Sequence, residues 1–313
     1  MQVIEIRHPY HQEQLPNEPM VLVLGFFDGV HKGHQKVIET GRKKADELGI
    51  KLAVMTFNQH PSIVFKKIAP HSMKYLTTVK QKANLMAQQG VDYLFVVDFT
   101  SGFASLSPQA FVDQYIVNWQ AKVVVAGFDY TYGPKEIAAM EHLPLYAKER
   151  FEVITVPKKT LTGEKVSSTR VRQALAAGEM EEVNTMLGYE YVTEGLVVHG
   201  DARGRLLGFP TANIQTKSTV RLPKEGVYVT EILIGETWYP SMGSIGRNDT
   251  FEKNRPITVE VNIFDFHEDI YGEHVEVRWL AYLRDQEAYP SVDALITQLQ
   301  LDEKNSRAYF TDK

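Results

Sequence analysis

The chain of 313 residues contains no cysteine. Disulfide bonds, thiolate zinc sites and cysteine nucleophiles are therefore excluded, and the composition is compatible with a reducing compartment. No apolar run approaches the length of a membrane span, and the first residues, MQVIEIRHPYHQEQLP, lack a basic segment followed by an apolar core. The formal net charge is only -5, which argues against a general binder of nucleic acid or membrane surfaces. We expect a cytoplasmic protein of enzyme size, a monomer or weak homo-oligomer, in which any phosphate site is local.

The chain also lacks a Pro-rich, Gly/Ser-rich or low-complexity linker, but its pattern changes once. Between residues 20 and 178, β-rich runs such as MVLVLG, KLAVMTF and AKVVVAG alternate with amphipathic stretches. This alternation predicts a doubly wound parallel α/β sheet with helices on both faces. Beyond residue 188, alternating strands joined by Gly-containing turns predict an antiparallel barrel, and SVDALITQLQLDEKNSRAYF returns to helical spacing. We therefore predict two domains, 1–186 and 187–313.

The stretch GFFDGVHKGHQ, residues 25–35, directly follows the apolar run MVLVL. In a doubly wound sheet, ligands bind beyond the carboxyl ends of the strands. Gly29 and Gly33 would let the backbone approach a phosphate, and His31 and His34 would point to one side as hydrogen-bond donors. This combination favours phosphoryl or nucleotidyl transfer. The alternatives are two surface histidines or, less favoured because a third ligand is missing, a zinc site.

Three further segments fall at later strand ends or helix starts: TFNQHP, GFDYTYG and VSSTRVR. In the last of them, Ser168 and Thr169 supply hydroxyls at an expected helix N-terminus, and Arg172 lies within one turn of both. This is a second arrangement suited to grasping phosphate. Taken alone, it could also be a helix cap with a solvated arginine.

In this order and spacing, the four segments resemble the adenylyltransferase module of the bacterial bifunctional riboflavin kinase/FMN adenylyltransferases, which belong to the H-x-G-H nucleotidyltransferase superfamily. The resemblance covers residues 20–186. It implies that His31 and His34 act at the ATP α-phosphate, and that Arg172 is catalytic beside phosphate contacts from Ser168 and Thr169. The other nucleotide and flavin contacts that it implies are Gly25, Phe26, Asp28, Gly33, Asn58, His60 and Asp129.

The chain departs from this family at one loop. The family usually has F-D-P-H-P, whereas this chain has Asn58 and Gln59 before His60 and Pro61. One carboxylate is lost, which leaves the flavin and nucleotide contacts of this loop open. The chemistry expected of His31 and His34 is not affected.

The second half carries its own candidate site in GDARGRLLGFPTANI, residues 200–214. Its glycines permit close approach of the backbone, and the Thr211 hydroxyl and Asn213 carbonyl are hard oxygen ligands suited to phosphate-bound Mg²⁺. On the later strand ITVEVNIFDF, Glu260 faces away from its apolar neighbours by strand alternation. Taken alone, the first segment could be a common Gly-rich loop, and Glu260 a carboxylate on a solvated face.

The segments GRLLGFPTAN, LPKEGVYV, EVNIFDFHEDIYG and LRDQEAYPSVDALITQLQLD are similar, in order, to the riboflavin kinase module, a six-stranded antiparallel barrel with a C-terminal helix. This resemblance implies that Thr211 and Asn213 bind Mg-ATP and that Glu260 takes the proton from the riboflavin 5′-hydroxyl. Ser244 and Asp249 stand where the family commonly has Asn and Pro, so we expect altered loop stiffness and no change of reaction. The remaining nucleotide contacts that it implies are Gly204, Arg205, Gly208, Phe209, Pro210 and Thr211.

The leading hypothesis is a two-step, Mg²⁺-dependent enzyme whose partners are small molecules, with no nucleic acid or membrane. Riboflavin would be phosphorylated to FMN by ATP, and FMN adenylylated to FAD with release of pyrophosphate. One alternative is a flavin-binding regulatory protein that lost one chemistry. Another is a kinase that lost the adenylyltransferase, as Asn58 and Gln59 suggest. Simple flavin binding would not require the residues retained here: His31, His34, Arg172, Thr211, Asn213 and Glu260.

Overall fold

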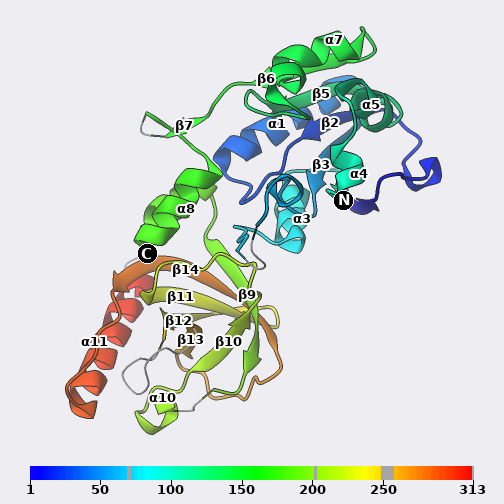
Figure 1. The fold of residues 1–313 in the computed structure, drawn as a ribbon. Helices are drawn as coiled ribbons and strands as arrows, with labels where there is room; N and C mark the ends of the chain where they lie inside the picture. Colours follow the sequence, from blue (N-terminus) through cyan, green and yellow to red (C-terminus); the bar gives the residue numbers. More distant parts are fainter. Residues whose placement is uncertain (69–71, 162, 201–202, 248–256, 312–313) are drawn as a thin grey trace. The chain divides into compact units, whose positions relative to one another are not determined.

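The computed structural model describes residues 1–313 apart from 69–71, 162, 201–202, 248–256 and 312–313. The chain divides into two compact units, Met1–Ser168 and Thr169–Lys313 (Figure 1). Each unit encloses its own sheet or barrel, so both parts of the predicted fold class are confirmed.

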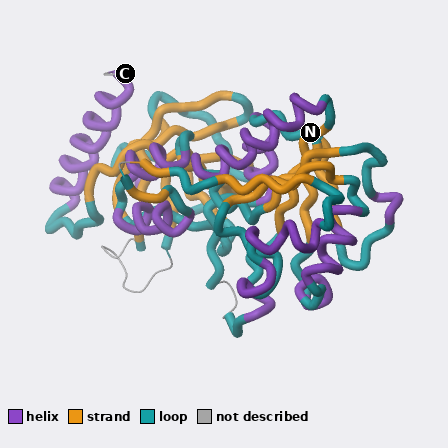
Figure 2. Tube along the Cα trace, turned by 90° about the horizontal axis from the view of Figure 1, so that it is seen from above, coloured by secondary structure: helices purple, strands orange, loops and turns teal. Residues whose placement is uncertain are grey.

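The first unit is built on a six-stranded sheet with strand order β1-β4-β3-β2-β5-β6, in which all neighbouring strands are parallel. Figure 2 shows helices above and below the strands of this sheet near the N-terminus. The strand β1 was not predicted, although QVIEI has the alternation of a half-buried strand. The strands are β1 (Gln2–Ile6), β2 (Met20–Leu24), β3 (Lys51–Phe57), β4 (Tyr93–Val97), β5 (Ala121–Gly127) and β6 (Glu152–Val156), with a separate hairpin of β7 (Thr160–Leu161) and β8 (Glu164–Lys165).

The helices of this unit connect the strands or cover the sheet. Two 3₁₀ turns, Gln12–Gln14 and Met140–His142, and a π-helical segment, Asp113–Val117, complete it. The α-helices are α1 (Lys32–Leu48), α2 (Ser62–Phe65), α3 (Val79–Gln88), α4 (Ser101–Ala104), α5 (Pro108–Val112), α6 (Lys135–Ala138) and α7 (Leu143–Ala147).

The run MVLVL is uniformly apolar because β2 is buried on both faces. Met20, Leu22 and Leu24 belong to the core cluster on one face of the sheet, whereas Val21 and Val23 belong to the cluster on the other. All five side chains are at most 1% exposed. Each such burial stabilises the fold by about 1.5–3 kcal/mol. The strand that leads into the H-x-G-H stretch is therefore held rigidly from both sides.

Helix α1 is fixed against this strand at close range. A Cβ at Gly41 would lie 2.5 Å from Val23 Cγ2, so glycine lets the helix backbone approach the sheet. The helix ends at Gly49, whose left-handed φ of 64° and N–H bond to the Ala45 carbonyl form a C-cap. Its start at Lys32 is thereby held at the carboxyl end of β2, where ligand binding was predicted.

The second unit is a closed antiparallel barrel with strand order β10-β13-β12-β11-β14-β9. Strand β10 lies in the segment that was interpreted from the sequence as a Gly-rich loop. The final helix, α11 (Val292–Thr311), matches the predicted helix and lies along β11 and β12 (Figure 1). The remaining elements are β9 (Tyr191–Val198), β10 (Ala212–Thr216), β11 (Gly226–Ile234), β12 (Thr237–Gly246), β13 (Thr258–Ile263), β14 (His274–Arg284), α8 (Ser168–Ala177), α9 (Met180–Leu187) and α10 (Arg203–Leu206).

Helix α9 packs on the barrel, although the predicted domain limits, 1–186 and 187–313, separate them. The Asn184 side chain donates to the Trp279 carbonyl at 3.0 Å and accepts from the Tyr191 N–H at 2.8 Å. Val183 and Met186 are buried on the same helix. The predicted domain boundaries stay a prediction, because the packing of α9 on the barrel does not show which segment folds by itself.

A buried ion pair attaches α11 to the barrel. Arg284 Nε donates to both carboxylate oxygens of Asp302, at 3.0 and 3.1 Å, and the Asp302 side chain is only 2% exposed. Gln298 on the same helix also donates to Asp302, at 2.9 Å. Breaking such a pair from one side leaves a charge that has lost its partner.

We therefore expect Asp302→Ala to destabilise the second unit by about 3 kcal/mol. Hydrogen exchange on the full chain should show faster exchange in β14 and α11, with the parallel sheet unchanged. The matched control is Glu303→Ala, which removes the partially exposed Glu303–Arg307 pair and should cost less than about 0.5 kcal/mol. Equal exchange rates in both variants would contradict an anchoring role for Asp302.

Candidate active sites

The turn between β2 and α1 has an unusual backbone. Phe27, Gly29 and Val30 all have left-handed φ values, of 55°, 82° and 34°. Glycine adopts this conformation freely, but for an aromatic or β-branched residue it costs on the order of 1–3 kcal/mol. Such a conformation persists only where the surroundings hold it, and here several hydrogen bonds do so.

Asp28 supplies the first of these anchors from a side chain that is only 3% exposed. Its Oδ1 accepts from the backbone N–H groups of Leu76, at 2.9 Å, and Thr77, at 3.2 Å. The Gly29 N–H donates to Thr77 Oγ1 at 3.0 Å, and Ser168 Oγ donates to the Asp28 carbonyl at 2.8 Å. Asp28 thus holds the turn together, and its predicted contact with a ligand stays a prediction.

The two histidines of the motif lie face to face. Their rings stack with centroids 3.6 Å apart and planes 17° from parallel. His31 is the N-cap of α1, and its Nδ1 accepts from the His34 N–H at 3.3 Å. In neutral His31 the proton is consequently on Nε2, which is left as a donor. The Phe27 ring meets the His34 ring edge to face at 5.2 Å.

The surroundings of His34 keep it uncharged. Burial lowers the pKa of His34 well below its usual value, and the positive charges of His31, Lys82 and Lys165 act in the same direction. Its Nδ1 is buried and has no hydrogen-bond partner among the residues that the structure describes. At neutral pH, His34 is therefore a neutral imidazole that can offer one N–H donor.

Gly33 leaves space for the His31 ring. A Cβ at this position would lie 3.0 Å from Cε1 and 3.1 Å from Nδ1 of His31, and 3.5 Å from the Val166 carbonyl oxygen. Any side chain at position 33 would press against the imidazole. The glycine therefore has a steric reason within the protein, in addition to the close approach of the backbone that the sequence suggested.

Lys82 is a feature of this site that the sequence analysis missed. Its Nζ donates to the Phe26 carbonyl at 2.7 Å and to Thr56 Oγ1 at 3.1 Å, and it lies 4.4 Å from the centre of the Phe26 ring. Burial lowers the pKa of Lys82 to about 8, while the Asp28 carboxylate acts in the opposite direction. A sequence signal existed, because Lys82 is spaced one helical turn from Met86, the other buried residue of α3.

Asn58 and Gln59, the departure from the family pattern, connect two loops at the carboxyl end of the sheet. Asn58 Nδ2 donates to the Asp98 carboxylate at 2.7 Å, and Asn58 Oδ1 accepts from the Phe99 N–H at 3.1 Å. Gln59 Nε2 donates to the Phe99 carbonyl at 2.9 Å. An aspartate at position 58 would set a second carboxylate against Asp98, so the amide suits its neighbour. The effect on ligand contacts stays open.

The other predicted contacts in this unit also follow strands β2, β3 and β5. The His60 ring meets the Phe26 ring edge to face at 5.1 Å, and the His60 backbone N–H donates to the Tyr75 hydroxyl at 3.1 Å. Asp129 is an exposed side chain after β5 and pairs with Lys165 Nζ at 2.5 Å. A Cβ at Gly25 would lie 2.5 Å from the Phe27 ring.

Helix α8 begins at Ser168, as the sequence predicted. Ser168 is joined to the turn of the first unit through its bond to the Asp28 carbonyl. Thr169 and Arg172 belong to the second unit. Their predicted roles at the phosphates stay predictions.

In the barrel, the structure brings together the three residues predicted for the kinase site. Thr211 Oγ1 donates to Glu260 Oε2 at 3.3 Å. Asn213 on β10 and Glu260 on β13 are directly opposite in the antiparallel register. A Cβ at Gly200 would lie 2.3 Å from Asn213 Cγ, so the Asn213 side chain packs on bare backbone.

The loop before Thr211 turns tightly on its glycines. The Gly204 carbonyl accepts from the Phe209 N–H at 2.8 Å, and a Cβ at Gly204 would lie 2.3 Å from the Phe209 carbonyl oxygen. Gly208 has a left-handed φ of 83°. Phe209 is buried in the core, and the Pro210 carbonyl accepts from Asn262 Nδ2 at 2.7 Å.

Two barrel residues, Ser244 and Asp249, differ from the residues that are common in the family. Asp249 lies outside the described residues. Ser244 lies opposite Glu260 in the register of β12 and β13. Its Oγ accepts from Gln286 Nε2 at 2.7 Å. The expected change in loop stiffness stays a prediction.

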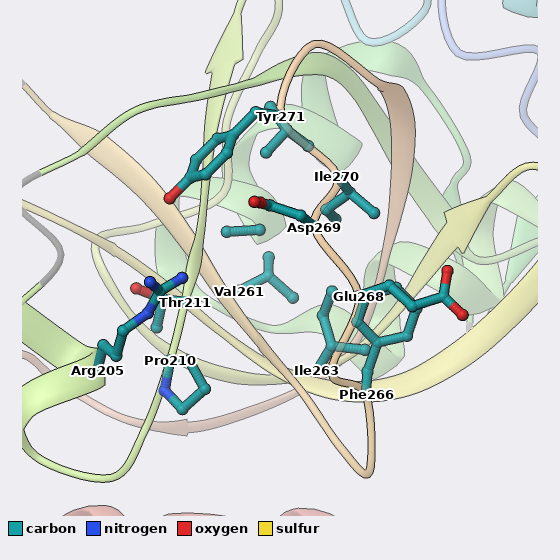
Figure 3. A pocket seen from close by; sticks show the side chains of 12 residues that line it. Arg205, Pro210, Thr211, Val261, Ile263, Phe266, Glu268, Asp269, Ile270 and Tyr271 are labelled. Atoms are coloured by element: carbon teal, nitrogen blue, oxygen red, sulfur yellow. The ribbon is translucent and has the colours of Figure 1, made fainter.

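A pocket of about 80 Å³ opens beside Thr211 (Figure 3). Arg205 and Pro210 lie with Thr211 on one side of it, and Tyr271 lies across from them. The Tyr271 ring stacks on His199 at 3.8 Å. Residues 266–271 were given no predicted role, although Glu268, Asp269, Phe266 and Tyr271 place two carboxylates and two large aromatic side chains within six residues. The full lining is Val197, Arg205, Pro210, Thr211, Ala212, Val261, Ile263, Phe266, Glu268, Asp269, Ile270 and Tyr271.

Comparison with known proteins separates the same two parts. The FAD synthetase family model matches residues 13–170, and the riboflavin kinase family model matches residues 187–310. A bifunctional riboflavin kinase/FMN adenylyltransferase of Listeria monocytogenes is 46% identical over 99% of this chain and 98% of its own length. The chain belongs to the bifunctional riboflavin kinase/FMN adenylyltransferase family. The resemblance and the enzyme class expected from the sequence are confirmed, with an FAD synthetase domain preceding a riboflavin kinase domain.

A second member of the bifunctional riboflavin kinase/FMN adenylyltransferase family, from Bacillus subtilis, is 38% identical over 100% of this chain and 99% of its own length. Among solved structures, a protein described as a macrolide-efflux protein from Streptococcus pneumoniae is 40% identical and superposes with a TM-score of 0.88, covering 97% of this chain and 99% of that one. Among the described residues, no helix has the length and apolar character needed to cross a membrane.

Proposed function

We propose that the riboflavin kinase domain phosphorylates riboflavin with ATP and that the FAD synthetase domain adenylylates the resulting FMN, releasing pyrophosphate. The observation that carries this proposal is the pairing of reactive side chains in each domain. The stacked histidines at the start of α1 can donate hydrogen bonds to a phosphate. In the barrel, by contrast, the Glu260 carboxylate beside Thr211 can accept a proton. The first arrangement suits attack by an existing anion, and the second suits activation of an alcohol.

In the adenylylation, an FMN phosphate oxygen bonds to the ATP α-phosphorus, and the bond from that phosphorus to the bridging oxygen breaks. The FMN phosphate is already an anion and needs no base, so catalysis consists of alignment and of offsetting the charge at phosphorus. We assign this task to the N–H donors of His31 and His34, together with backbone N–H groups at the start of α1. Arg172, Ser168 and Thr169 hold the phosphates, and Asp129 lies in the nucleotide pocket.

In the phosphorylation, Glu260 accepts the proton of the riboflavin 5′-hydroxyl while that oxygen bonds to the γ-phosphorus of ATP, and ADP leaves. The hydroxyl of Thr211 orients the carboxylate from 3.3 Å. The tight loop around Gly204 and Gly208, with Arg205 at the pocket, contacts the nucleotide. Phe209 fixes this loop to the core.

Mg²⁺ fits the barrel site by the chemistry of its donors. Among the described residues, no three His, Asp or Glu side chains form a metal-binding cluster. Mg²⁺ nonetheless needs only one or two protein oxygens besides phosphates and waters, and Thr211 and Asn213 provide hard oxygens next to Glu260. When bound, the ion would offset the negative charge of the ATP phosphates.

We also propose a cytoplasmic, monomeric or weakly oligomeric protein whose partners are riboflavin, FMN and ATP. The absence of cysteine is compatible with a reducing compartment, and the moderate net charge of -5 argues against a general binder of nucleic acid or membrane surfaces. The direct test of the function is to incubate the purified chain with riboflavin, ATP and Mg²⁺ and to resolve the flavins over time. FMN should appear first and FAD later. FMN without FAD, even from supplied FMN, would favour the kinase alone, and flavin binding without turnover would favour a regulatory protein.

A fragment of residues 169–313 should make FMN and no FAD, because α9 and all the proposed kinase residues lie within it. The shorter fragment 187–313 should also make FMN, but it lacks the buried Val183 and Met186 and should melt at a lower temperature. A loss of only 1 kcal/mol lowers Tm by roughly 4 °C in a domain of this size. Kinase assays and thermal melts of both fragments test this expectation. A folded 169–313 fragment that requires residues 1–168 for kinase activity would contradict it.

A further inference from the structure

Among the described residues, Lys82 is the lysine whose side chain is buried, with 2% of its surface exposed. Moving an ammonium group out of water costs several kcal/mol unless it is well compensated. Its hydrogen-bond partners are uncharged oxygens: the Phe26 carbonyl and the Thr56 hydroxyl. An apolar side chain at this position of α3 would pack against the sheet without that cost. We therefore look for a function of the Lys82 ammonium group other than packing against the sheet.

The Phe26 carbonyl is the point at which Lys82 acts on the backbone. It accepts from Lys82 Nζ at 2.7 Å and from Thr56 Oγ1 at 2.8 Å, so both of its lone pairs are used. The next residue, Phe27, is the first of the left-handed residues in the turn, and its ring supports His34. Holding the Phe26 carbonyl fixes the peptide plane that leads into this strained conformation.

We propose that Lys82 is a positioning residue for adenylyl transfer: its ammonium group holds the Phe26 carbonyl, and with it the turn that presents His31 and His34 to the phosphates. The inference rests on the proposed function of the FAD synthetase domain. Lys82 acts through the two histidines and does not itself contact the reacting atoms. Asp28 performs the equivalent task at the middle of the turn through the N–H groups of Leu76 and Thr77.

The charged form of Lys82 is the one that donates to both oxygens at full strength. The charged and titratable groups near it are Asp28 in the turn and His34 on α1, whose ring stacks on His31. The rings of His60 and Tyr75 contact the same Phe26 ring as the ammonium group. Since burial lowers the pKa of Lys82 to about 8, adenylylation should decline as the pH rises through that value. Arginine stays charged throughout this range, so Lys82→Arg should shift the decline to higher pH.

The experiment compares Lys82→Met, Lys82→Arg and the control Lys80→Met in the full chain. Lys80 is exposed on the same helix, so its replacement should change nothing. Initial rates of FMN adenylylation are measured against FMN, ATP and pH, and riboflavin phosphorylation is measured on the same samples. Lys82→Met should lower kcat on the order of 10²-fold, since small misplacements of reacting groups have effects of this size, with a much smaller change in KM and none in kinase activity. Lys82→Arg should recover most of the rate, with a flatter alkaline limb.

Three outcomes would overturn the inference. The first is wild-type adenylylation in Lys82→Met. The second is a loss of adenylylation in Lys82→Met that matches its loss of folded protein and that Lys82→Arg does not restore. The third is an alkaline decline that Lys82→Arg leaves in place. Failure of the proposed function is recognised separately, because the wild-type chain would then form no FAD from FMN and ATP.

Discussion

Replacing His31 or His34 by alanine should slow FMN adenylylation by roughly 10² to 10³, which is the usual effect of removing one preorganised donor from a site of developing charge. The stacked rings place both imidazoles at the start of one helix, and His34 is held neutral by burial and by its positive neighbours. Both rings carry an N–H that can donate to a phosphate oxygen. FMN binding should change little, because these donors act on the ATP α-phosphate.

The assay is a steady-state measurement of both half-reactions on each variant, with FMN affinity determined separately by fluorescence quenching. His31→Asn is a matched control for His31→Ala. His31 caps α1 by accepting from the His34 N–H, and alanine loses that cap at a cost of about 1 kcal/mol, whereas asparagine retains a capping oxygen. Both variants should lose adenylylation, but only alanine should lose stability. Intact adenylylation in the alanine variants would refute the phosphate role, and loss of both half-reactions together would indicate a structural one.

Replacing Glu260 by glutamine should lower riboflavin phosphorylation on the order of 10² to 10⁴-fold, because the amide cannot accept the proton of the 5′-hydroxyl. Glutamine has nearly the same volume and still offers an oxygen to the Thr211 hydroxyl, which lies 3.3 Å from the carboxylate. The barrel should therefore remain folded. FAD formation from supplied FMN should be unaffected, because that reaction needs no base.

This prediction is checked by measuring FMN formation from riboflavin and FAD formation from FMN on the same sample. Thr211→Ser is the companion variant, since it keeps the hydroxyl beside Glu260 and should retain most of the kinase activity. A Glu260→Gln variant with near-native kinase rates would make Glu260 an ordinary residue of a partly solvated strand face.

Local sequence patterns were sufficient to predict those strands, turns and helices whose conformation depends on neighbouring residues in the chain. The uniformly apolar MVLVL and the run VVVA within AKVVVAG indicated strands buried on both faces, and the alternating runs after residue 188 indicated strands with only one buried face. The step from β2 through a Gly-containing turn into α1 was likewise visible, because strand, turn and helix signals follow each other directly. Two strands were missed: β1 mixes polar and apolar residues ahead of the α/β pattern, and β10 lies inside a Gly-containing segment.

Some site features follow only from contacts between distant residues. Phe26, Thr56 and Lys82 come from the turn after β2, from β3 and from α3, and no periodicity relates them. The role of Asn58 depended on Asp98, which lies after a neighbouring strand. Each residue alone fits an ordinary loop, strand or helix, so its chemical meaning came from the neighbours that the strand order supplies.

The sequence by itself determined most of the strands and helices, the change from α/β to barrel, and the segments proposed for phosphate chemistry, because periodicity, glycine turns and helix caps act over a few residues. The tertiary structure alone decided which side chains meet. Strand order, barrel closure and register place Asn213 opposite Glu260 and Lys82 under the Phe26 carbonyl. A shift of one residue in register would turn a strand's side chains to the other face, which the alternating pattern opposes. A shift of two residues keeps the alternation, so the pattern alone does not select the partner of Glu260.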